Sequence, residues 1–214
     1  MKVVNILFSQ AVRLGKVSGA GGGSVYGINL TKACEERYGF LQGPRDLADY
    51  DLSKGVTFLH GYFGDRVVID KFQVYANGLL AEAKVDTDDL EAFLDDVIKW
   101  VTERGGFQFE QDPAAPKIYE SHLEVETNAS LNAALSKFSP LGIQIADVLR
   151  GYKQVTPDWE VSGLSFGTAR PADAASFRFE RREGASVPHN VFFATSRMRT
   201  KDHLKILEEF EAML

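Results

Sequence analysis

A glycine-rich segment could bind an anion. It reads Ser18-Gly19-Ala20-Gly21-Gly22-Gly23-Ser24 and lies between an apolar run and a helix-like run. Glycine lets backbone N–H groups close around a phosphate. The segment lacks the Gly-Lys-Ser/Thr ending of a Walker motif, and the dinucleotide fingerprint would require a third glycine at position 24. A spacer loop is the favoured interpretation. The alternative is an anion site whose candidate residues are Gly21, Gly22, Gly23 and Ser24.

Arginines form one local concentration of positive charge near the end of the chain. They are Arg178, Arg181, Arg182, Arg197 and Arg199, on two strand-like runs and the turn between them. Guanidinium groups bind carboxylates or phosphates through paired N–H donors. Ion pairs with acidic side chains on the same sheet face are the favoured interpretation. The alternative is binding of an anionic ligand, with Arg178, Arg182, Arg197 and Arg199 as candidates.

The strand-like run Ile118 to Glu126 carries a possible set of metal ligands. Glu120, His122 and Glu124 alternate along it, so their side chains share one face at intervals of roughly 6 to 7 Å. That spacing is loose for one ion, and the chain has no HExxH motif or paired Cys/His spacing. Solvent-facing charge is therefore favoured.

Nucleophilic catalysis finds no support. Cys34 falls on the apolar side of a short helix, where a buried small hydrophobe is expected. Ser165 lies in Gly-Leu-Ser-Phe-Gly, which matches the letters of a nucleophile elbow but lies within a strand pattern that no helix follows. His203 is expected to pack half-buried or at the surface. We assign no catalytic residue and expect neither enzymatic activity nor a cofactor.

Composition indicates an ordinary globular protein. The 214 residues are 44% hydrophobic and 25% charged, and the formal net charge is −6. Acidic residues outnumber basic ones equally in both halves, which disfavours a nucleic-acid-binding surface. One cysteine forbids an internal disulfide framework, and no apolar run is long enough to span a membrane. We therefore expect a cytoplasmic protein that does not associate with membranes.

The sequence contains an apparent internal repeat, and the elements of this repeat would position the candidate residues described above. The segments 77–97 and 190–210 align without a gap at an offset of 113, with five identities. These are Asn77/Asn190, Ala81/Ala194, Thr87/Thr200, Asp89/Asp202 and Leu94/Leu207. Both segments read as a strand, a capping Thr and an amphipathic helix. Leu94 and Leu207 are therefore expected at equivalent core positions.

Apolar periodicity and turn residues predict the elements of each half. In the first half we expect strands at 3–8, 56–63, 67–75 and 79–85, and helices at 30–38 and from Thr87 to Gly105. Asn77-Gly78 predicts a type I′ hairpin turn. In the second half we expect strands at 118–126, 159–166, 176–181 and 190–198, and helices at 129–149, interrupted at Pro140, and from Thr200 onward.

These elements predict an α+β fold in one domain, residues 1–214. It comprises pseudo-repeats at about 1–107 and 113–214, each with the order strand, helix, three strands, helix. The sheet is expected to be antiparallel-rich, with helices packed on one face. This order is similar to one half of the saddle of the TATA-binding protein, which has one strand more. The resemblance is of element order alone and transfers no function. Carboxylates at 120, 124 and 126 on the open sheet face would repel DNA phosphates.

Two functions follow as hypotheses. The first is a non-enzymatic interaction or assembly protein that forms homo-oligomers, for instance by extending its sheet, or binds a protein partner. Its support is the number of strand aromatics, which exceeds what one sheet face buries. The second is a binding module for an anion, a nucleotide or nucleic acid that uses segment 19–23 and the arginines at 178–199.

Overall fold

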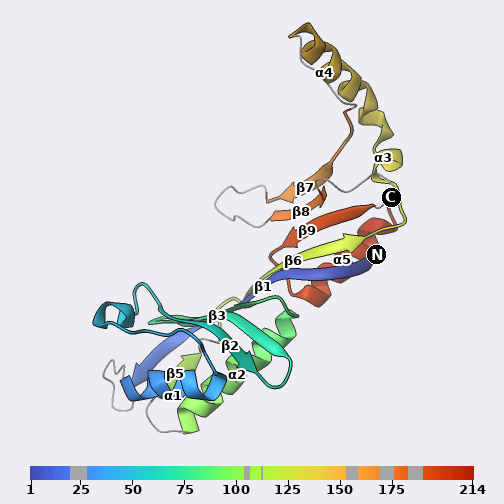
Figure 1. Ribbon diagram of the computed structural model, residues 1–214. Helices are drawn as coiled ribbons and strands as arrows, with labels where there is room; N and C mark the ends of the chain where they lie inside the picture. The colour runs from blue at the N-terminus through green and yellow to red at the C-terminus, as the bar shows by residue number, and fades with distance from the viewer. Residues whose placement is uncertain (20–27, 104–106, 112, 153–158, 169–175, 183–189) are drawn as a thin grey trace. The chain divides into compact units, whose positions relative to one another are not determined.

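The protein is described by a computed structural model that covers residues 1–19, 28–103, 107–111, 113–152, 159–168, 176–182 and 190–214 (Figure 1). Over these residues the chain forms five α-helices and nine strands, which confirms the predicted mixed α and β class. The strand order in the sheet is β2-β3-β4-β1-β6-β9-β8-β7, with β5 paired to β1 outside this path. All strand pairs with a defined register are antiparallel.

The chain divides into two compact units, and each unit is assembled from separate stretches of sequence. The N-terminal unit comprises residues 6–122 and 197–201. The C-terminal unit comprises residues 1–5, 123–196 and 202–214. The predicted description as one domain of two repeats is a different partition of the chain, and it stays a prediction.

Strand β1, Lys2–Gly19, is much longer than the strand predicted at 3–8. The predicted strand ended at residue 8, and this was wrong, because β1 continues through residue 19. Arg13 and Leu14 pair with Leu79 and Gly78 of β4, and Val17 pairs with Phe109 of β5. Residues without a strong strand pattern of their own thus extend the strand because two partners are available.

The central hairpins of the N-terminal unit form where they were predicted. They consist of β2, Val56–Phe63, β3, Val67–Tyr75, and β4, Gly78–Ala83. The predicted turn type is wrong, because Tyr75 pairs with Gly78 and neither Asn77 nor Gly78 has a positive φ. Glycine is required at position 78 for another reason: a Cβ there would lie 2.7 Å from the carbonyl oxygen of Arg13 on β1.

Two helices pack on these strands and share one core with them. Helix α1, Ile28–Tyr38, ends where Gly39 adopts a φ of +61°. Helix α2, Thr87–Glu103, buries Leu90, Phe93, Leu94, Val97 and Trp100. The Phe93 ring lies edge-on to the rings of Phe72 and Tyr38, 5.3 and 5.2 Å between centroids, so sheet and both helices meet at this point. Strand β5, Phe107–Gln111, and the 3₁₀ helix η1, Leu47–Tyr50, were not predicted.

The remaining elements follow the predicted order. They are β6, Ile118–Glu126; α3, Leu131–Ala134; the 3₁₀ helix η2, Ser136–Phe138; α4, Ser139–Gly151; β7, Gly163–Gly167; β8, Ser176–Arg181; β9, Val191–Ser196; and α5, Thr200–Glu211. Pro140 lies in the first turn of α4, so it restarts the helix, which is one of the two outcomes that the sequence allowed, a restart or a kink. Strand β7 begins four residues later than the predicted strand at 159–166.

Burial confirms most of the predicted core. Tyr119, Ser121, Leu123 and Val125 are buried along β6, and both Leu94 and Leu207 are fully buried. His203 was predicted to be half-buried or exposed, and this was wrong. Its side chain is completely buried, with its ring 5.6 Å from that of Phe177. None of the helices among the described residues is both long enough and apolar enough to span a bilayer.

Candidate functional site

The short helices α3 and η2 lead directly into α4, and this helical segment is the most unusual feature of the C-terminal unit (Figure 1). Ser130 caps α3 by accepting a hydrogen bond from the Ala133 N–H. Phe138 precedes α4, and Pro140 occupies its first turn, where the missing N–H costs no helical hydrogen bond. Local sequence therefore defines where each helix begins.

Helix α4 exposes most of its apolar side chains. Of its 13 residues, Ala146 alone is buried. Leu141 and Val148 are each 55% exposed, Ile143 is 62% exposed, and Tyr152 at the C-cap is 67% exposed. Leu141, Ile145, Val148 and Tyr152 follow at spacings of four, three and four, so they form one stripe along the helix. A stripe of this kind usually packs against another surface.

A groove runs beside this helix. It has a volume of about 400 Å³ and lies between the α3–α4 segment and residues 159–164. A Cβ at Gly142 would collide with the Trp159 carbonyl oxygen, so the glycine permits this close approach. Leu135, Phe138 and Leu164 contribute apolar surface to the groove, and the Asn132 amide donates a hydrogen bond to Glu160 at its edge. The stripe and the groove together are called the α4 surface below.

Helix α4 carries no net charge. The only ionisable residues of α4 are Asp147 and Arg150, and they pair with each other at 2.6 Å between Nη1 and Oδ1. An electrically neutral, apolar helix is suited to protein contact and unsuited to binding phosphate.

The predicted anion-binding residues are not brought together within one unit. Gly21, Gly22, Gly23 and Ser24 lie outside the described residues. Arg178 and Arg182 belong to the C-terminal unit, whereas Arg197 and Arg199 belong to the N-terminal unit. Arg178 and Arg197 are exposed.

Arg182, directly after β8, forms an ion pair with an acidic side chain of β6, as the sequence favoured. Its Nη1 lies 2.5 Å from Oε1 of Glu124, and the Asn5 amide donates to the other oxygen of that carboxylate at 2.5 Å. Glu124 is buried, contrary to the expectation that it faces solvent. These two partners occupy both of its oxygens.

The other candidate metal ligands do not gather around a common point. The His122 ring contacts Glu120 through Nε2 and Oε1 at 2.7 Å. Among the described residues, no group of three or more His, Cys, Asp or Glu side chains is placed to hold a metal ion. The proposed nucleophiles are equally unsupported, since Cys34 is buried as expected and Ser165 lies within β7, after which the next described element is the strand β8.

One polar cluster in the N-terminal unit was not predicted. Glu91 of α2 accepts hydrogen bonds from Arg13 at 2.6 Å and from the Tyr119 hydroxyl at 2.5 Å, and its Oε2 lies 3.0 Å from Nη2 of Arg199. The Arg199 guanidinium also lies 4.8 Å from the centre of the Tyr119 ring. In the structure Arg13 follows Ser9 and Ala11 at every second position, and all three lie on the buried face of β1. The sequence did not identify this face, because the predicted strand ended at residue 8.

The electrostatics of this cluster indicate a structural role. Burial alone would raise the pKa of Glu91, but the hydrogen bonds from Tyr119 and Arg13 outweigh it and hold the pKa below 4.5. Burial and the neighbouring Glu91 carboxylate raise the pKa of Tyr119. Glu91 is thus ionised and Tyr119 protonated at neutral pH, and neither is poised for acid–base exchange.

Comparisons of the chain with protein-family models, with curated proteins and with solved structures found no match.

Proposed function

We propose that this chain is a non-enzymatic interaction protein that forms a homodimer through the α4 surface. The carrying observation is that a 13-residue helix buries a single residue while four apolar side chains in and next to it are more than half exposed. Ordering such a helix without burying its apolar stripe brings little stabilisation, because most helical stability in proteins comes from packing. A partner that covers the stripe would supply the missing packing and so stabilise the helix.

A second copy of the chain suits this surface because the surface is self-complementary. It carries an apolar ridge, the stripe on α4, and an apolar groove whose wall includes two residues of that stripe, Leu141 and Ile145. In a twofold dimer each copy can place its ridge in the groove of the other. The Asp147–Arg150 pair leaves no net charge on α4, so this helix would not repel α4 of the second copy.

Sheet extension is a less favoured route to the same dimer. Strand β7 lies at one end of the strand order but has only five residues. At the other end, β2 is already bridged by the pairing of Gln42 with Leu59. Both edges therefore offer few backbone groups to a second copy.

Sedimentation velocity at micromolar concentration tests the homodimer. The wild type is expected to sediment as a dimer, and the double variant Leu141→Glu/Val148→Glu as a monomer. Leu47→Glu is the control, because Leu47 is 88% exposed on η1 of the N-terminal unit and does not belong to the α4 surface, so this variant should remain dimeric. A monomeric wild type would reject the homodimer, and a dimeric double variant would place the contact elsewhere.

The internal duplication is part of the same proposal. It is supported by the strand order, in which β2-β3-β4-β1 is followed by the sequence-equivalent strands in reverse, β6-β9-β8-β7. Two contacts join residues to their own counterparts at an offset of 113. Thr87 and Thr200 each donate a backbone N–H to the hydroxyl of the other, and Lys201 lies 2.8 Å from Asp88. Such contacts are expected near the axis that relates two copies.

Anion, nucleotide or nucleic-acid binding is the alternative proposal. Two of its four candidate arginines, Arg182 and Arg199, are engaged with carboxylates. Arg178 and Arg197 remain exposed, with no ion pair to another described residue. Thermal-shift titration with polyphosphate and oligonucleotides would detect such binding, since a ligand at 100 times its dissociation constant stabilises by roughly 2.7 kcal/mol.

A further inference from the structure

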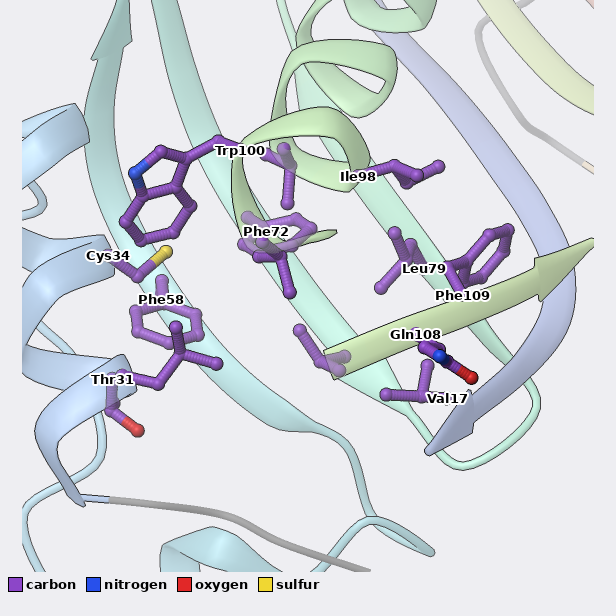
Figure 2. A pocket seen from close by; sticks show the side chains of 14 residues that line it. Val17, Thr31, Cys34, Phe58, Phe72, Leu79, Ile98, Trp100, Gln108 and Phe109 are labelled. Carbon is purple, nitrogen blue, oxygen red and sulfur yellow. The ribbon is translucent and has the colours of Figure 1, made fainter. Parts of the chain in front are cut away.

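The N-terminal unit contains an apolar pocket with a volume of about 70 Å³, and this pocket shares no lining residue with the α4 surface (Figure 2). Its 14 lining residues come from α1, α2 and all five strands β1 to β5. Figure 2 shows Phe58, Phe72 and Leu79 on the sheet side and Trp100 projecting from α2. A space bounded by so many elements is defined by the fold as a whole.

The lining excludes charged ligands. None of the described residues that line the pocket is Asp, Glu, Lys or Arg. Their polar side chains are those of Thr31, Cys34 and Gln108, together with the Trp100 indole N–H. A charge placed there would lose its hydration without gaining a partner. Thr31 and Cys34 are buried, whereas Gln108 is exposed, so Gln108 marks the side that opens to water.

Size and polarity together favour an alkyl ligand. A buried water needs two to four polar partners, and an engineered apolar cavity of about 150 Å³ in another protein stays dry and binds benzene. The pocket here has about half that volume, so it suits a narrow alkyl chain better than a ring. An unfilled space of this kind would also forfeit dispersion contacts for the aromatic rings that line it.

We propose that this pocket binds the short alkyl chain of a small neutral amphiphile, with the chain against Phe58, Phe72 and Leu79 and the polar end at Gln108. Burial raises the pKa of the Cys34 thiol to about 12, so the thiol is protonated at neutral pH and adds no charge to the pocket. This inference does not depend on the proposed homodimer.

Straight-chain alcohols from butanol to octanol are suitable probes. Trp159→Phe leaves Trp100 as the one tryptophan of the chain, so its emission reports the pocket. We expect a saturable emission change and a raised melting temperature with hexanol, and a dissociation constant at least tenfold weaker for hexanoate. Absence of both signals for every alcohol in the series would overturn the proposal.

A matched pair of variants on β3 locates the site. Val74 lines the pocket, whereas Val68 is exposed on the same strand and does not. Val74→Phe is expected to weaken hexanol binding at least tenfold, and Val68→Phe to leave it unchanged. Equal binding by both variants would contradict the proposed site.

Cys34 provides a test in the wild-type protein that does not depend on the folding of any variant. It is the single cysteine of the chain and lines the pocket. Saturating hexanol should slow its modification by N-ethylmaleimide several-fold. A labelling rate that hexanol leaves unchanged would argue against occupancy of the pocket.

Discussion

At the scale of single residues, partners decide which charged groups remain available. Arg13, Arg182 and Arg199 look similar in the sequence, yet each binds a carboxylate that is largely buried. In all three pairs the carboxylate belongs to Glu91 or Glu124, and it accepts a further hydrogen bond from a neutral side chain, Tyr119 for Glu91 and Asn5 for Glu124. The arginines in these clusters therefore stabilise the fold through internal ion pairs.

Among these charged residues, Glu91 is the one whose neutralisation should lower the free energy of unfolding most. Glu91→Gln keeps the shape of the side chain but removes the carboxylate charge that Arg13 and Arg199 share. Asp95, at 3.3 Å from Arg13, and Asp88, at 3.8 Å from Arg199, then remain as their anionic neighbours. We expect the free energy of unfolding in urea to fall by about 1 to 3 kcal/mol at pH 7. Glu103→Gln, on an exposed acid of the same helix, should change it by less than about 0.5 kcal/mol.

The effect of Glu91→Gln should depend on pH. Because folding lowers the pKa of Glu91, its carboxylate stabilises the folded state above the ordinary pKa of 4.5, and this contribution is lost as pH falls through the lower folded value. The difference in stability between wild type and Glu91→Gln should therefore shrink on acidification below pH 4.5. A difference that stays constant down to pH 3 would contradict ionisation of Glu91 as its source.

At the scale of elements, the sequence predicted helix and strand bounds best where the apolar pattern and the turn residues agree. The bounds of β2, β3, β6 and β8 match the predicted ranges, because alternating apolar residues end at clear turn residues. The glycine after Tyr38 and the proline at 140 predicted two helix boundaries correctly. Strand β5 and the second half of β1 were missed, since their pairing comes from partners distant in sequence rather than from a local pattern.

The candidate sites were less predictable than the elements. Glu91 reads as one acid among several on α2, and nothing in its neighbourhood identifies Arg13 or Tyr119 as partners. The apolar residues of α4 read as core, because periodicity shows that a helix has an apolar stripe but cannot show what covers it. The partners of Glu91 and the exposure of α4 both depend on contacts between residues distant in sequence, which sequence patterns do not show.

Helices α2 and α5 begin with threonines that cap each other, and this pairing can be tested by mutation. Each Thr hydroxyl at these starts accepts the buried N–H of the other, so Thr87→Val and Thr200→Val should each leave one N–H unpaired. We expect similar losses of about 1 to 2 kcal/mol in urea unfolding. Thr102→Val, on an exposed threonine near the end of α2, should be nearly neutral. Strongly unequal losses at 87 and 200 would weaken the case for duplicated capping positions.

At the scale of the whole molecule, the two compact units share their chain elements. β1, β6 and α5 each contribute residues to both units. Unfolding one unit would therefore remove strand or helix residues that continue into the other. This covalent sharing favours a single cooperative transition over two independent ones.

Two buried leucines test this cooperativity, because Leu94 lies in the N-terminal unit and Leu207 in the C-terminal unit. Leu94→Ala and Leu207→Ala should each lower the free energy of unfolding by about 2 to 5 kcal/mol. Each substitution should shift the fluorescence transitions of Trp100 and Trp159 together, followed separately in Trp159→Phe and Trp100→Phe backgrounds. If Leu207→Ala shifted the Trp159 transition and left that of Trp100 in place, the units would unfold independently, and the shared strands would not couple them.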